Sequence, residues 1–174
     1  MKIIMIYDQI QAGAGTKDDK MIPLSVQRDA VGPAIMMEQF LKKIDGKILA
    51  CLYCGNGTYL ENKEEVTRKL VGMVNKLKPD VVMCGPAFNY ADFADMSAHV
   101  CSEIMKHTDI PALAAMSQEN ETIIEEFKDS ILIVKTPKKG GTGLNDALSN
   151  MCKVADALHQ NIDTTELKKA VCYN

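Results

Sequence analysis

Residues 81–89 read "VVMCGPAFN", a short apolar run that passes directly into a cysteine, a glycine and a proline. Such a run is typical of a strand that is buried on both faces of a parallel sheet. Gly85 and Pro86 then end the strand, because glycine reaches backbone angles closed to other residues and proline has no N–H to donate. We expect this turn to expose the Asn89 amide and to place Phe88 over a bound ligand.

Runs of the same kind recur along the chain. They lie at residues 2–7, 47–53, 80–83, 111–115 and 130–134, and the run at 111–115 has fewer β-branched residues than the others. Segments with the apolar spacing of helices alternate with them, at residues 33–44, 61–77, 92–107 and 144–159. The second of these segments should end before Pro79, because the residue before a proline disfavours helix.

Strands that alternate with helices predict an α/β fold, since parallel strands need a crossover, usually a helix, between them. We expect one doubly wound parallel sheet of about five strands, with helices on both faces, over residues 1–160. The favoured strand order is the flavodoxin-like 2-1-3-4-5, and another Rossmann-like order stays open. A C-terminal tail, residues 161–174, should hold a short helix from Thr164 that packs on the body or on a neighbour.

Composition narrows the classes of partner. The 174 residues carry a net charge of -3, with Lys and Arg scattered among Asp and Glu, which argues against nucleic-acid binding. No apolar stretch approaches the roughly 20 residues that span a bilayer, and residues 1–9 turn polar too soon for a secretory signal. We therefore expect a cytoplasmic protein without a membrane partner, whose six cysteines do not form a disulfide framework.

In open parallel sheets, ligands bind beyond the carboxyl ends of the strands. This rule selects the loops at 8–19, 54–62, 84–93 and 135–143, which are rich in Gly, Asn, Thr or Pro. The substrate-binding residues expected there are Gly55, Asn56, Glu61, Gly85, Pro86, Phe88, Asn89, Thr136, Gly140 and Gly141.

Two thiols are the candidate catalytic groups. Cys54 and Cys84 each close a strand and precede a glycine, and their strands flank the first strand in the favoured order. They should lie about 10 Å apart, too far for a disulfide but close enough to face one ligand. Cys84 could equally be a small core residue. A direct bond from Cys51 to Cys54 would be strained, because residues three apart in a strand point to opposite faces.

The remaining motifs leave alternatives open. The "GAG" at 13–15 is read as the interior of a flexible or ligand-covering loop, since it lacks the glycine spacing of a dinucleotide site. The loop "TPKKGGTG" at 136–143 is either an anion site at a helix N-terminus or a solvated turn. We expect no metal site, because the three histidines lack ligand spacing. Four carboxylates are candidates for binding an amine or for acid/base work, or else cap helices or lie on the surface: Asp8, Glu61, Asp92 and Asp95.

The motif "GPAFN" resembles the signature of the B-component selenoprotein of the glycine, sarcosine, betaine and D-proline reductase family. Further segments resemble the family in order and spacing, over roughly residues 1–160: "VGPAIMMEQ" (31–39), "CGNGTYLEN" (54–62), "IPALAAMSQEN" (110–120) and "IVKTPKKGGTG" (133–143). Cys54 and Cys101 match family cysteines. Cys51, Cys84 and the first loop depart from the pattern.

The resemblance implies an anaerobic, multi-component complex that reductively cleaves the C–N bond of a small amino compound. It also implies that a selenocysteine attacks the α-carbon while a pyruvoyl-bearing subunit holds the amine. The chain resembles the amino-terminal half of the family protein, whereas the selenocysteine belongs to the other half. We therefore expect no cofactor in this chain, with the pyruvoyl group and the selenocysteine supplied by other subunits.

Two functions follow as hypotheses. In the first, the chain is a subunit or stand-alone relative of the reductase, with Cys54 as its thiol and Asn56, Asn89 and Thr136 as polar contacts to an amino or carboxylate compound. In the second, it is a small-molecule-binding or assembly module without chemistry of its own, so the question of catalysis stays open. A flavodoxin-like FMN carrier is disfavoured by the scarcity of aromatic residues. The apolar helices leave a homo-oligomer possible.

Overall fold

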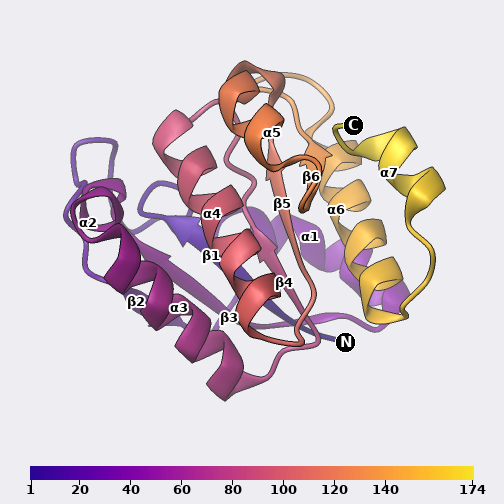
Figure 1. The fold of residues 1–174 in the computed structure, drawn as a ribbon, viewed down its shortest axis with the longest axis horizontal. Coiled ribbons are helices and arrows are strands. Elements are labelled where there is room, and N and C mark those ends of the chain that lie inside the picture. Colours follow the sequence, from indigo (N-terminus) through magenta and orange to yellow (C-terminus); the bar gives the residue numbers. More distant parts are fainter.

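The computed structural model describes residues 1–174 as one mixed sheet surrounded by helices (Figure 1). The sheet has six strands in the order β2-β3-β1-β4-β5-β6. Their bounds are β1 (Lys2–Asp8), β2 (Ser25–Gln27), β3 (Lys47–Cys54), β4 (Val81–Cys84), β5 (Ala112–Met116) and β6 (Leu132–Lys135). Five of them are the predicted strands in the predicted order, all parallel, so the doubly wound α/β fold is confirmed.

Strand β2 was missed by the sequence analysis. It is a three-residue edge strand that pairs antiparallel with the second half of β3. None of its residues is buried, so it lacks the apolar run by which the other strands are recognised.

Helices cover both faces of the sheet. Figure 1 shows α3, α4 and α5 on one face and α1 and α6 on the other, and the packing of α1 on α6 and of α3 on α4 agrees with this division. The bounds are α1 (Pro33–Leu41), α2 (Asn56–Glu61), α3 (Lys63–Leu77), α4 (Ala91–His107), α5 (Glu121–Phe127), α6 (Leu144–His159) and α7 (Thr165–Val171), with 3-10 turns η1 (Lys42–Ile44) and η2 (Gln118–Asn120).

The predicted helices differ from the structure at their ends. The segment at 33–44 is helical to Leu41 and then tightens into η1, and the segment at 61–77 begins at Lys63 after the separate short helix α2. Helix α3 ends at Leu77, before Pro79, as expected. Helix α5 was not predicted, because its seven residues are too few to show a clear period.

The central strand sets the position of the site. Residues 3–7 of β1 are buried completely, because helices cover both faces of a parallel sheet. The chain passes from β1 to β3 on one side of it, and the next crossover runs from β3 to β4 on the other side of β1, so the chain reverses its winding beside β1. The loops that follow β1, β3 and β4 therefore meet at one edge of the sheet.

The C-terminal segment packs on the body of the protein. After α7, Cys172 forms an isolated antiparallel β-bridge with Val134 of β6. The backbone N–H of Tyr173 donates to the Ile133 carbonyl at 3.0 Å. The Lys168 ammonium donates to the Lys128 carbonyl at 3.0 Å. None of the helices combines the length and apolar character that crossing a bilayer requires.

Candidate functional site

The carboxyl end of β1 carries a buried carboxylate. Asp8 is the last residue of β1 and lies opposite Cys54 in the register with β3. Its Oδ1 atom accepts a hydrogen bond from the Gln11 backbone N–H at 2.7 Å, and its Oδ2 atom lies 3.4 Å from the Asn56 side-chain amide. Burial raises the pKa of the Asp8 carboxyl, although these two hydrogen bonds lower it in part.

Gln9 joins the loop after β1 to the start of α2. Its Oε1 atom accepts from the Asn56 backbone N–H at 3.0 Å, and its Nε2 atom donates to the Thr16 carbonyl at 3.3 Å. The Asn56 Oδ1 and Gln11 Nε2 atoms are buried beside this link without a partner in the protein. Both are available to a bound molecule or water, since buried polar atoms are almost always hydrogen-bonded.

A pocket of about 390 Å³ opens above these residues. Its volume falls within the range of small-molecule sites, roughly 300–1,000 Å³. Three loops contribute to it, one after each of β1, β3 and β4, so it occupies the switch point of the sheet. The residues that line it are Ile10, Lys17, Asp18, Lys20, Asn56, Tyr90, Ala91 and Asp92.

The turn "GPAFN" lies beside this pocket and is packed against β5. Gly85 has φ 115°, and a Cβ atom on it would lie 2.6 Å from the Ala115 carbonyl oxygen, so no other residue fits without strain. The Phe88 carbonyl accepts hydrogen bonds from the Ser117 backbone N–H at 2.9 Å and from the Asn120 side chain at 2.6 Å. Only 3% of Phe88 is exposed, and the residue does not line the pocket.

Asn89 reaches the loop after β6. Its Oδ1 atom accepts from the Lys139 backbone N–H at 2.8 Å, and the Lys139 ammonium lies 5.1 Å from the centre of the Phe88 ring. The hydrogen bond from Lys139 to Asn89 joins the loops at 84–93 and 135–143, both of which were expected to bind a ligand. Thr136 is buried and its hydroxyl donates to the Pro137 carbonyl, whereas Gly140 lies in an exposed turn.

The structure thus brings one of the expected binding residues, Asn56, into the pocket lining, whereas Gly55, the residue before it, is buried and outside the lining. Asp92, a candidate carboxylate of the sequence analysis, is also in the lining. Glu61 is exposed at the end of α2 and outside the lining. The other expected residues, likewise outside the lining, are Gly85, Pro86, Phe88, Asn89, Thr136, Gly140 and Gly141.

Both candidate catalytic thiols are fully buried. The Cys54 thiol lies 4.0 Å from the Met96 sulfur of α4, and burial, with a smaller effect of the Asp8 charge, raises the pKa of Cys54 to about 12. Cys84 lies beside Cys101, whose pKa is raised by burial and then by this neighbouring thiol. Because the thiolate is the nucleophile, these surroundings make Cys54 a poor attacking group. All six cysteines are free thiols.

Asp95, another candidate carboxylate, is engaged with its neighbours. Its Oδ2 atom accepts from the Tyr59 hydroxyl at 3.1 Å and from the Lys63 ammonium at 3.0 Å. This group ties α2 and α3 to α4, and it lies outside the pocket lining.

The sequence analysis selected the three loops that line the pocket, but it did not name most of the individual lining residues. Lys17, Asp18 and Lys20 belong to a loop whose path depends on distant contacts, such as the Thr58 backbone N–H donating to the Lys20 carbonyl at 3.1 Å. Tyr90 and Ala91 follow the quoted turn directly. Their position after β4 was the available signal, because that loop was already assigned to the site.

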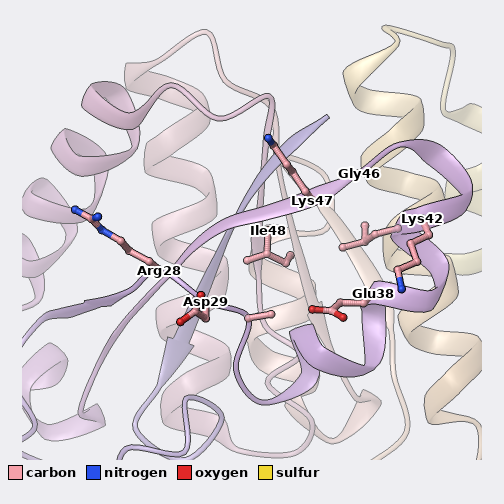
Figure 2. A pocket seen from close by; sticks show the side chains of 9 residues that line it. Arg28, Asp29, Glu38, Lys42, Gly46, Lys47 and Ile48 are labelled. Atoms are coloured by element: carbon pink, nitrogen blue, oxygen red, sulfur yellow. The ribbon is translucent and has the colours of Figure 1, made fainter.

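A second pocket, of about 380 Å³, lies at the opposite end of β3, beside α1 (Figure 2). Figure 2 shows Glu38 on α1, Lys42 at the start of η1 and Ile48 on β3 around it. It is far from the carboxyl ends of the strands, where the switch-point rule places ligands.

Comparison with known proteins agrees with the sequence resemblance. The model of the family described as "Glycine/sarcosine/betaine reductase selenoprotein B (GRDB)" matches residues 1–171. A glycine reductase complex component B subunit gamma from Carboxydothermus hydrogenoformans is 29% identical over 121 residues, which cover 70% of this chain and 27% of the relative. A sarcosine reductase complex component B subunit beta from Peptoclostridium acidaminophilum is 24% identical over 89% of this chain and 34% of the relative.

A betaine reductase complex component B subunit beta from the same organism is 23% identical over 90% of this chain and 35% of the relative. The chain therefore spans about a third of the length of these relatives. No solved structure matches it. The relationship to D-proline reductase stays a prediction. The match along nearly all of its length shows that this chain belongs to the glycine/sarcosine/betaine reductase selenoprotein B family.

Proposed function

We propose that this chain is the substrate-binding part of a reductase assembly, and that it holds a small zwitterion in the switch-point pocket. The observation that carries the proposal is the lining itself. Lys17 and Lys20 stand in the same pocket as Asp18 and Asp92, so one cavity offers partners for a carboxylate and for a cationic nitrogen.

The two charged ends of the ligand have different partners. A carboxylate can accept hydrogen bonds from the lysine ammonium groups, and an N–H of the ligand can donate to the unpartnered Asn56 Oδ1 atom. The nitrogen can lie against the carboxylates of Asp18 and Asp92, and a methylated nitrogen can also face the Tyr90 ring, because aromatic faces attract quaternary ammonium groups. Glycine, sarcosine and betaine, after which the family is described, all have this pair of charges.

The proposal does not use Cys54 as the nucleophile. A thiol whose pKa lies at about 12 is almost entirely protonated at neutral pH, and Cys54 has no exposed surface. The 174 residues contain no selenocysteine. In this proposal, the nucleophile and the pyruvoyl group for reductive C–N cleavage are supplied by other polypeptide segments. The role of this chain is then to bind the substrate and to orient its α-carbon.

Isothermal titration calorimetry with glycine, sarcosine and betaine tests this function. The variants Lys20→Gln and Asp92→Asn should each weaken binding about tenfold or more, because each removes a charged hydrogen bond. Lys43→Gln and Asp129→Asn change exposed charges outside the pocket and serve as matched controls. Binding that is equal in all four variants would overturn the proposal.

The second hypothesis, a non-catalytic small-molecule-binding or assembly module, includes a form that only docks with partner subunits, and the names of the relatives, which are subunits of complexes, support that form. This form predicts no heat with any of the three compounds. It also predicts that thermal stability is unchanged by them, whereas a bound ligand raises stability by mass action.

A further inference from the structure

The outer edge of β3 is only half covered. Strand β2 pairs with residues 51–53 of β3, and the stretch Lys47–Ala50 has no strand on that side. Loops and side chains also give no hydrogen bond to the backbone of Ile48, Leu49 or Ala50. The register of β3 with β1 shifts between Ile48 and Ala50, so Leu49 is a bulge, and these four residues present an edge no longer than about 13 Å, at roughly 3.3 Å per residue. Unpaired peptide groups along such an edge are a template for a further strand.

A pocket lies on each side of this open edge. On the α1 side, the pocket of about 380 Å³ is lined by Leu41 of α1 and Ile48 of β3 (Figure 2). On the α3 side, a pocket of about 640 Å³ is lined by Leu49 of β3 and by Met73 and Leu77 of α3. Because α1 and α3 cover opposite faces of the sheet, the two pockets open above and below the same edge.

The exposed apolar surface is concentrated at the α3 side of the edge. Val26 of β2 is 47% exposed and Leu77 is 39% exposed, and both line the pocket of 640 Å³. Five of the seven residues around that pocket are hydrophobic. A side chain inserted there would remove apolar surface from water on both partners.

The charges around the edge are mostly basic. Four basic and two acidic residues line the two pockets, while the chain as a whole has a net charge of -3. A second copy of this chain is a poor occupant, because pairing through a two-fold axis would bring the same basic residues opposite each other. The basic residues are Arg28, Lys42, Lys47 and Lys76, and the acidic ones are Asp29 and Glu38.

We propose that the open edge of β3, residues Lys47–Ala50, receives an extended segment of a different subunit, with two adjacent apolar residues flanked by acidic ones. Successive residues of a strand point to opposite faces, so adjacent apolar side chains would enter the two pockets, one each. The backbone of the segment would complete the sheet, and its acidic residues would face the basic rim. The named relatives are components of complexes, which is consistent with a partner subunit for this chain.

The probe is a set of fluorescein-labelled eight-residue peptides. Each has two central positions that combine Leu, Val, Ile and Phe, flanked by Thr and then by pairs of Glu; the counterpart set carries Lys in place of Glu. Fluorescence anisotropy at low ionic strength should show binding of at least one Glu-flanked peptide, and about tenfold weaker binding of its Lys-flanked counterpart. If no Glu-flanked peptide binds better than its counterpart, the proposal is wrong.

Substitutions in the lining of the 640 Å³ pocket test whether the peptide binds at this edge. Val26→Lys and Leu77→Lys should each weaken binding about tenfold, because a charge then occupies the apolar pocket. Met105→Lys changes an equally exposed methionine of α4 and is the matched control. The bound peptide should also slow hydrogen exchange at the amides of residues 48–50. Binding without that slowing, or a dimer of the chain that Leu77→Lys dissociates, would overturn the proposal.

This inference does not depend on the zwitterion pocket, which lies at the opposite end of β3. Loss of glycine or betaine binding would leave the peptide result unchanged. Loss of peptide binding would likewise leave the calorimetry unchanged.

Discussion

The side chain of Gln9 accepts a hydrogen bond from the backbone N–H of Asn56 at 3.0 Å, and this buried contact is one of those that join the loops following β1 and β3. Both residues are buried. The bond satisfies an N–H group at the start of α2, where the helix has no partner of its own for it. The floor of the pocket is therefore held by a contact between residues 47 positions apart in the chain.

Gln9→Ala should destabilise the protein by about 1–3 kcal/mol, because it leaves the buried Asn56 N–H without a partner. The free energy of unfolding from urea denaturation measures this. Gln39→Ala is the matched control, since the Gln39 amide donates only to an exposed carbonyl in its own helix. An equal effect of the two substitutions would show that the link does not hold the loops.

The stability of the protein should depend on the ionisation of Asp8. Burial raises the pKa of this carboxyl in the folded state above its unfolded value, so the folded state binds more protons between the two values. The contribution of Asp8 to the free energy of unfolding is therefore fully present below the unfolded pKa, about 3.9. It is lost as the pH rises through the folded pKa.

Asp8→Asn removes the charge and keeps an acceptor for the Gln11 N–H. The difference in unfolding free energy, variant minus wild type, should rise with pH, by no more than about 1.4 kcal/mol per pH unit for one proton. Urea denaturation at a series of pH values from 4 upward measures it. A difference that stays flat, or falls, with pH contradicts the assigned shift.

Cys54 should resist alkylation in the native protein. With a pKa of about 12, only about one thiol in ten thousand is ionised at pH 8. Mass spectrometry of iodoacetamide-treated protein should find Cys54 unmodified in buffer and modified in urea. Rapid labelling of Cys54 under native conditions would instead restore it as a candidate nucleophile.

Two glycines provide a matched pair for the turn after β4. Gly85→Ala should cost more than about 1 kcal/mol, because the φ of 115° and the Ala115 carbonyl 2.6 Å from the new Cβ both oppose it. Gly72→Ala lies in the middle of α3 with open space around it, and should stabilise the protein by up to about 1 kcal/mol. Equal effects would mean that the turn can relax.

The sequence predicted the fold well, because the signals for it are local. Runs such as Ile3–Tyr7 are apolar throughout, which identifies strands buried on both faces, and the alternation with helices then limits the topology. The edge strand Ser25–Gln27 was missed because none of its three residues is buried, so it has no apolar run. It is defined only by its pairing with residues 51–53 of β3, which are distant in the chain.

The site was only partly predictable. The switch-point rule predicted the edge of the sheet where this pocket lies, and Asn56 in its lining, because the rule depends on strand order alone. It did not predict that Lys20 would line the pocket, or that Phe88 would pack against β5. These positions follow from contacts between distant loops, which no local pattern records.

Amide chemical shifts of the ¹⁵N-labelled protein, titrated with glycine and with betaine, test the zwitterion pocket most directly. We predict that the largest changes cluster at residues 17–20, 56 and 90–92, and that they saturate. Changes centred on the other end of β3, around Ile48, or no change at high ligand concentration, would contradict it.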